Sequence, residues 1–139
     1  MQRLLVIGLA WLAALPALAG ERIGAADLAK TFAGMTMDGV YQNGEAFSET
    51  YEASGSIRYR DTRGSDQGKW SVQGEMFCTF YKDQQGACFF VEHETGNCFT
   101  FYEPRKAEDG HLEPQLNWSS RGWDHKHPRT CSTAPEVAI

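Results

Sequence analysis

The stretch EMFCTFYKDQQGACFFVEHETGNCFTFYE, residues 75–103, contains three aromatic-rich runs that each carry one cysteine. The runs span residues 75–82, 87–93 and 97–103, and the segments between them, DQQG and ETG, are typical of turns. Short runs rich in Phe, Tyr and Val with turns between them predict consecutive antiparallel strands. We therefore expect a β-meander that is crosslinked by disulfide bonds.

Similar runs precede this stretch, at residues 36–41, 46–52, 56–60 and 68–73. The first two are joined through Asn43-Gly44, a dipeptide typical of tight hairpins. Strands that recur about every ten residues predict an all-β fold, in which an antiparallel meander forms a small barrel or a sandwich.

The segment AADLAKTF, residues 25–32, has a different pattern. Leu28 and Phe32 are four residues apart and would share one face of a helix, and Gly34 follows as it does at many helix ends. A helix this short is not stable alone. We expect one short N-terminal helix that plugs or caps the β domain.

The N-terminal segment is typical of a secretory signal. Arg3 provides the positive charge, residues 4–15 are apolar, and Ala17-Leu18-Ala19 matches a cleavage site. The alternative, an uncleaved membrane anchor, does not suit an apolar run that is short and broken by Pro16. We expect an exported chain that is cleaved after Ala19, with a single β domain at residues 20–131 and a disordered tail at 132–139.

All four cysteines, Cys78, Cys88, Cys98 and Cys131, follow the predicted signal. An even number of cysteines in an oxidising compartment predicts two disulfides. The ten-residue spacings lack the C-x2-C pairs of metal sites and the C-x-x-C motif of redox proteins.

Side-chain parity along the strands indicates which cysteines meet. If Thr95-Gly96 is a two-residue turn, Phe90 lies opposite Phe101. Cys88 and Cys98 then point to opposite faces of the sheet, which argues against a bond between them.

Two registers are open for the preceding hairpin, with Cys78 opposite either Val91 or Cys88. The second register gives one face that is almost wholly apolar and leaves Thr79, Tyr81, His93 and Thr100 on the other face. The apolar face consists of Met76, Cys78, Phe80, Cys88, Phe90, Phe99 and Phe101. Burying a large apolar side chain is worth about 1.5–3 kcal/mol, so we expect this register. It predicts disulfides Cys78–Cys88 and Cys98–Cys131.

The net charge of the full sequence is -5, and its lysines and arginines are scattered rather than clustered. Without a basic stripe we expect no nucleic-acid partner. No stretch after the predicted signal is apolar enough to span a bilayer. We expect a monomer without a membrane span in the mature chain.

Several short motifs form a familiar series. They are FAGMT at residues 32–36, YEASGSI at 51–57 and GKWSVQG at 68–74, followed by Cys78 and Cys88. The series resembles small exported proteobacterial proteins that are grouped in domain-of-unknown-function families, with a G-x-W-x-V-x-G-x-x-x-C pattern and a second cysteine.

The resemblance covers about residues 27–91 and implies a periplasmic β-fold, but no activity. Ser54-Gly55 stands where the pattern has Asp-Gly, and Cys98 and Cys131 lie outside it. The last third of the chain therefore has no template.

The segment from Trp118 to Trp123 places two tryptophans on either side of Arg121, in a region without clear periodicity. Aromatic residues and arginine are enriched at interaction hot spots. We take Trp118, Arg121 and Trp123 as a candidate interface or ligand site, against the alternative that they fill the core.

His125 and His127 form an H-x-H pair, which on a strand would point both imidazoles to one face. His93 and His111 would complete a metal site. Pro128 favours a solvated loop instead, so the pair stays a candidate and we expect neither a metal nor a cofactor.

The remaining chemistry does not favour an enzyme. Glu92, Glu94 and Glu103 would have to gather to act as paired acids, and charged residues at strand ends are usually solvated. Nucleophile elbows, phosphate-binding loops and haem motifs are absent from the sequence.

We therefore expect a non-enzymatic periplasmic binding or accessory module that contacts an envelope protein. The alternative from another class is a calycin-like carrier of a small hydrophobic ligand, in which the helix covers the open end of a barrel. A periplasmic metal-binding protein is a third possibility.

Overall fold

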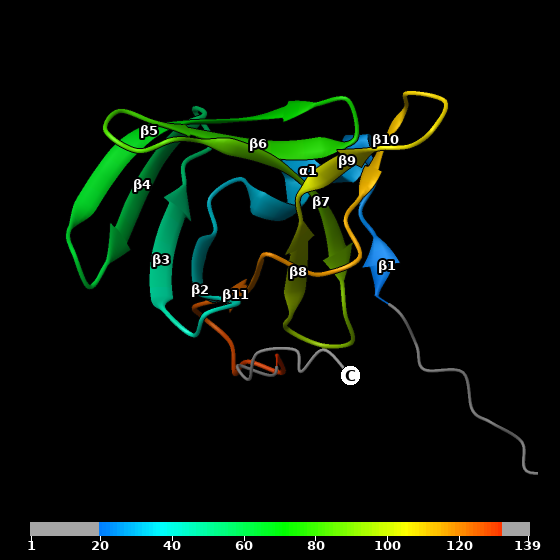
Figure 1. Cartoon of the computed structure of the whole chain (residues 1–139). Coiled ribbons are helices and arrows are strands. Elements are labelled where there is room, and N and C mark those ends of the chain that lie inside the picture. The colour runs from blue at the N-terminus through cyan, green and yellow to red at the C-terminus, as the bar shows by residue number, and fades with distance from the viewer. Residues whose placement is uncertain (1–19, 132–139) are drawn as a thin grey trace, which may run out of the picture.

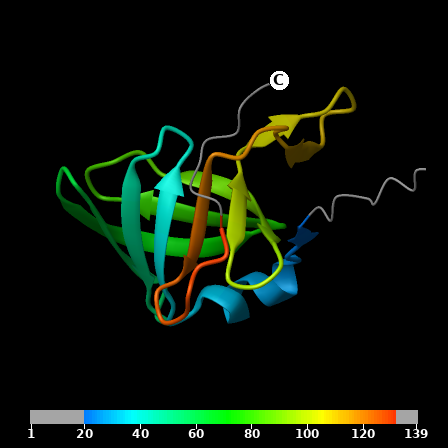
Figure 2. The same cartoon turned by 90° about the horizontal axis from the view of Figure 1, so that it is seen from below.

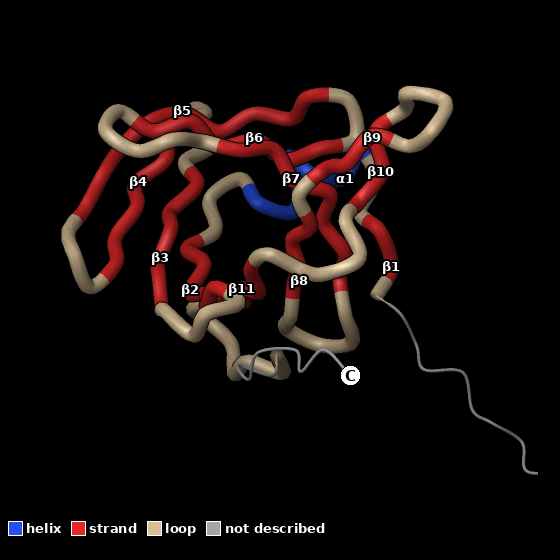
Figure 3. Tube along the Cα trace, viewed as in Figure 1, coloured by secondary structure: helices blue, strands red, loops and turns tan. Residues whose placement is uncertain are grey.

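The computed structural model describes residues 20–131, so the predicted signal (1–19) and tail (132–139) lie outside the described residues. Strands make up most of this part, with a single helix among the described residues (Figure 3). In chain order the elements are β1 (Glu21–Arg22), α1 (Ala25–Phe32), β2 (Thr36–Tyr41), β3 (Ala46–Tyr51), β4 (Ser56–Asp61), β5 (Ser65–Gln73), β6 (Met76–Tyr81), β7 (Ala87–His93), β8 (Phe99–Tyr102), β9 (Pro104–Lys106), β10 (Leu112–Pro114) and β11 (Ser120–Asp124).

The main sheet closes into an antiparallel barrel (Figure 1). Its strand order is β7-β6-β5-β4-β3-β2-β11-β8, and pairing of β8 with β7 closes the ring of eight strands within the described chain. β1 extends the β6 edge of β7, while β9 and β10 form a separate hairpin beside the barrel. The predicted all-β barrel with one short helix is confirmed.

The helix covers one end of this barrel (Figure 2). Leu28 and Phe32 are fully buried, and the Phe32 ring lies 4.7 Å from that of Phe77 and 5.3 Å from that of Phe99. We call this the closed end. The turns that follow β2, β4 and β6 lie at the other end, which we call the open end.

The loop between β7 and β8 differs from the prediction. The backbone N–H of Glu94 donates to the carbonyl of Cys98 at 2.9 Å, which leaves a three-residue loop, and Val91 rather than Phe90 lies opposite Phe101. One extra loop residue shifts the pairing of β7 with β8 by one position, and every side chain of β7 then lies on the opposite face relative to β8.

The predicted inward face is therefore wrong for β6 and β7, whereas Phe99 and Phe101 of β8 lie in the core as predicted. Phe77, Thr79 and Val91 are buried toward the interior, whereas Phe80 is 44% exposed on the outer surface. Phe90 is buried on the outside, where the Arg22 guanidinium lies 4.9 Å from its ring centroid.

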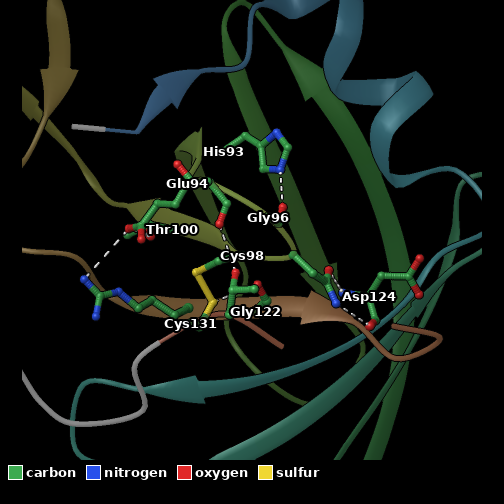
Figure 4. The surroundings of a disulfide bond; sticks show 12 residues. His93, Glu94, Gly96, Cys98, Thr100, Gly122, Asp124 and Cys131 are labelled. Carbon is green, nitrogen blue, oxygen red and sulfur yellow. Dashed lines mark hydrogen bonds and ion pairs between the residues drawn. A yellow bond between two sulfur atoms is a disulfide. The ribbon is translucent and has the colours of Figure 1, made fainter. Parts of the chain in front are cut away.

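Both predicted disulfides are confirmed. Cys78 lies directly opposite Cys88 and is bonded to it, and Cys98 is bonded to Cys131. The first bond crosslinks the β6–β7 wall, and the second ties the segment after β11 to the start of β8 at the closed end (Figure 4). Two disulfides indicate an oxidising environment.

A pair of glycines thins one part of the barrel wall. Gly39 in β2 lies opposite Gly122 in β11. A Cβ atom at Gly39 would lie 2.3 Å from the Phe47 ring, and one at Gly122 would lie 2.3 Å from the Met37 sulfur. Both larger side chains therefore lie directly against bare backbone.

Within residues 20–131, no helix has the length and apolar character needed to cross a membrane.

Candidate functional site

A cavity of about 220 Å³ lies inside the barrel toward the open end. Its polar lining includes Glu49, Gln84, Glu103 and Ser120. Aromatic rings from several strands form most of the rest, and they are Tyr41, Phe47, Tyr51, Tyr59, Phe77, Tyr81, Phe89 and Phe101. The cavity is thus walled by aromatic rings with a few polar groups among them.

Glu49 points into the barrel because of simple strand alternation. Phe47, Glu49 and Tyr51 occupy every second position of β3 and are buried, with Glu49 only 8% exposed. Ser48 and Thr50 between them face outward and are partly exposed. The carboxyl group therefore shares its face with two aromatic side chains.

Two phenols hold this carboxyl. The Tyr51 hydroxyl donates to Oε2 of Glu49, and the Tyr81 hydroxyl donates to Oε1. Burial raises the pKa of Glu49 above its ordinary value, although these two hydrogen bonds act in the opposite direction. The pKa values of Tyr51 and Tyr81 are also raised, first by burial and then by the Glu49 charge, so both phenols remain protonated donors.

Glu49 has no counter-ion among residues 20–131. None of the ion pairs in that part of the chain includes it, and none of the residues that line the cavity is a lysine, arginine or histidine. A carboxylate has about four acceptor positions, and the two phenols use two of them. Glu49 at the deep end of the cavity thus has hydrogen-bond partners for only part of its acceptor capacity.

A second polar chain runs along the rim of the cavity. Tyr41 donates to the Tyr59 hydroxyl at 3.1 Å, and Tyr59 donates to Oδ2 of Asp61 at 2.9 Å. The backbone N–H of Arg63 is the main reason why the pKa of Asp61 is lowered, and the guanidinium of Arg63 lies 3.1 Å from Asp61. Asp61 is therefore ionised and already paired.

The cavity continues into an open depression at the mouth, whose lining includes Glu45, Arg63, Glu103 and Trp118. Arg63 lies 3.8 Å from Glu45 in addition to its contact with Asp61. One cation is thus shared by two acids, and Glu103 adds a further negative charge at the rim. The mouth is negatively charged overall.

The predicted Trp118–Trp123 site is divided between different surroundings. Trp118 is 1% exposed, with the Arg121 guanidinium 4.6 Å from its ring, and its buried indole N–H has no hydrogen-bond partner among residues 20–131. Trp123 is partly exposed and lies 5.1 Å from the Arg129 guanidinium. Trp118 offers little surface to a partner, and contact with an envelope protein stays a prediction.

The four histidines are held by separate partners. His125 lies 2.6 Å from Asp38 and His127 lies 4.0 Å from Asp124. His111 lies in the β9–β10 turn beside Asp109, and His93 hydrogen-bonds the Gly96 carbonyl at 2.7 Å (Figure 4). No cluster of three or more His, Cys, Asp or Glu in the described part of the chain is arranged to hold a metal ion.

The three glutamates that could act as paired acids do not gather at one place: Glu92 and Glu94 both lie beside Gly20, and Glu103 lies at the other end of the barrel. Glu94 accepts a hydrogen bond from Thr100 at 2.6 Å near the Cys98–Cys131 disulfide at the closed end (Figure 4). Glu103 lines the cavity at the open end, and Glu92 lies opposite Arg22 in the backbone pairing of β7 with β1. They do not form a common site.

Glu49 and its phenol partners were missed in the sequence. The available signal was the alternation of Phe47, Glu49 and Tyr51, since a glutamate between two aromatic residues of one strand face must share their burial. Comparison with known proteins finds no matching family model, curated protein or solved structure. The assignment of function therefore depends on the geometry of the cavity.

Proposed function

We propose that the protein is a non-enzymatic periplasmic carrier that binds a small molecule in the cavity at the open end of its barrel. The signal-like segment with cleavage after Ala19 and the proteobacterial resemblance support periplasmic export, in line with the two disulfides. The carrier is the second of the functions expected from the sequence, with the helix at the end opposite the cavity.

The size and the lining of the cavity support this function. An engineered cavity of about 150 Å³ holds benzene, so a volume of about 220 Å³ suits a ligand of roughly ten non-hydrogen atoms. Aromatic walls with a few placed polar groups are typical of small-molecule sites, and barrel mouths are a common location for them.

The buried Glu49 is the observation that carries the proposal. A buried acid without a counter-ion lowers the stability of a fold, and an apolar side chain at this position would pack without that cost. Strained or costly groups are expected at functional sites. Glu49 also alters the expected ligand, which must be able to interact with a polar group rather than be wholly hydrophobic.

A cavity-filling variant tests the proposal. Ala87 lines the cavity, so Ala87→Phe would occupy it, while Ala26→Phe places the same side chain on the exposed surface of α1. The protein is titrated with mixtures of fragments of about six to ten non-hydrogen atoms and followed by two-dimensional amide NMR. We expect saturable chemical-shift changes at the open end in the wild type and in the control Ala26→Phe, and none in Ala87→Phe.

Ser120→Leu fills the cavity from β11 and replaces Ala87→Phe if that variant fails to fold. Fragment shifts that are scattered over the surface, or that persist in both filled variants, would show that the cavity is not a ligand site.

A further inference from the structure

The charge of the cavity narrows the class of ligand. Glu49 and Glu103 are the charged residues among those that line it, and both are acidic. Because phenols donate hydrogen bonds but carry no positive charge, Tyr51 and Tyr81 orient the Glu49 carboxyl without neutralising it. A ligand with a positive charge would supply the counter-ion that Glu49 lacks among residues 20–131.

The aromatic walls favour the same class. Tyr41, Phe47 and Tyr59 surround the cavity near the rim, with Tyr41 and Phe47 ring centroids 4.6 Å apart. Aromatic faces attract cations, and the attraction reaches about 2 kcal/mol when the cation is removed from water. Aromatic enclosures of this kind bind ammonium groups in many unrelated proteins.

The mouth would also select by charge. Glu45, Asp61 and Glu103 outnumber the single Arg63 there, and Arg63 is held by two of these acids. A negative entrance with low-dielectric walls raises the local concentration of cations and repels anions. An anionic ligand would meet repulsion at the mouth and again at Glu49.

From these three observations we infer that the ligand is a small organic cation, a primary or substituted ammonium compound, whose charged group binds Glu49 inside the aromatic cavity. This inference rests on the proposed carrier function and adds the class of ligand to it. Glu49 accepts hydrogen bonds from the ammonium group through the positions that Tyr51 and Tyr81 leave open.

Three isosteric probes test the inference: benzylammonium, benzyl alcohol and benzoate. They share a phenyl ring and differ in charge, and each is close to the size that the cavity admits. Binding is measured by isothermal calorimetry and by NMR on the wild-type protein. We expect benzylammonium to bind at least tenfold more tightly than benzyl alcohol, and benzoate not to bind at the open end.

Glu49→Gln keeps the shape of the side chain and removes its charge. We expect this variant to lose at least tenfold in affinity for benzylammonium and little for benzyl alcohol. The matched control is Glu52→Gln, which removes an acid that pairs with Arg58 at 3.3 Å near the closed end. It should bind all three probes as the wild type does.

Proton linkage gives a readout that a purely structural role of Glu49 would not change. Tyr41, Tyr51, Tyr59 and Tyr81 are the other titratable groups near this carboxyl, and each has a raised pKa. Glu103 also lines the cavity, and burial raises the pKa of Glu49. Benzylammonium should bind more tightly as the pH rises, with proton release, and this pH dependence should vanish in Glu49→Gln.

The outcomes separate the two proposals. If benzyl alcohol or benzoate binds at the open end as tightly as benzylammonium, the inference of a cation is overturned and the carrier function stands. If neither these probes nor the fragment mixtures bind at the open end, both are overturned.

Discussion

The two ends of this barrel are built from the same kinds of side chain and differ in what they leave open. At the closed end the Phe32 ring of α1 packs among Tyr51, Phe77 and Phe99 in a buried cluster of hydrophobic side chains. At the open end the rings carry hydroxyl groups and surround a cavity with a buried acid. Aromatic residues fill space at one end and enclose it at the other.

The difference teaches that the main stabilising contacts and the proposed ligand site lie at opposite ends of this fold. The helix, the main aromatic cluster and the Cys98–Cys131 disulfide lie at the closed end. The open end has hydrogen-bonded tyrosines and turns that are free of disulfides within the described chain. A rigid closed end lets the open end hold a group that costs stability.

Removing the helix plug should have the largest effect. Phe32→Ala is expected to lower the free energy of unfolding by about 3–5 kcal/mol, since it deletes a fully buried ring and leaves a cavity. Phe80→Ala deletes the same ring from a position that is 44% exposed, and it should cost less than about 1 kcal/mol. Denaturant unfolding measures both. Equal losses would mean that the closed end does not hold the fold together.

Loss of a disulfide should have the next largest effect, and the two bonds should differ. The Cys98–Cys131 bond spans 33 residues and the Cys78–Cys88 bond spans 10. The loss of loop entropy then predicts costs of about 4 and about 3 kcal/mol, respectively. Paired Cys→Ala variants, unfolded in guanidinium chloride, test the order. A larger loss from the β6–β7 bond would place the main crosslink in the wall rather than at the closed end.

Neutralising the acid at the open end should have the smallest effect, and in the opposite direction. The folded-state pKa of Glu49 is raised by burial, so its contribution to stability is fully present below the ordinary pKa of glutamate and is lost as the pH rises through the folded-state value. Glu49→Gln does not titrate. Without ligand it should be more stable than the wild type at pH 8, and the difference should shrink as the pH falls toward 4.

Calorimetric melting across this pH range measures the difference in stability, and Glu52→Gln, which removes an acid outside the cavity, is the control. A wild-type protein that is more stable than Glu49→Gln at pH 8 would mean that the fold itself requires the Glu49 charge.

Local signals in the sequence were sufficient for most of the architecture. The turn residues and the short runs between them predicted strands β2 to β8, and the spacing of Leu28 and Phe32 predicted the buried face of α1. The predicted register placed Cys78 directly opposite Cys88, and the structure has the same pairing. The predicted face of β6 and β7 that points into the barrel is wrong.

The inward face of β6 and β7 was predicted wrongly because it depends on the length of the loop between β7 and β8. A two-residue and a three-residue turn after Glu94 differ by one residue, and either satisfies the same Gly96 chemistry. The error moved Tyr81 to the outer surface and hid its contact with Glu49. A single misplaced residue in a turn thus concealed the candidate site.

The last barrel strand was missed for another reason. β11 includes Arg121 and Gly122, which belong to a segment without alternating hydrophobicity, and it inserts between β2 and β8 rather than beside its neighbours in sequence. Long-range insertion leaves no local pattern. The candidate interface residues Trp118, Arg121 and Trp123 lie on this strand and on the segment that leads into it, and their role as an interface stays a prediction.

The missing side chain at Gly39 determines how much of the barrel interior stays empty. Since the Phe47 ring occupies the place of the absent Cβ, any larger residue at 39 would push that ring inward or press against the neighbouring strand, where the Arg121 carbonyl is 2.8 Å from the same point. The residue at position 39 thus helps to set the volume of the cavity. A substitution at this one position would therefore change the volume of the cavity and leave Glu49 in place.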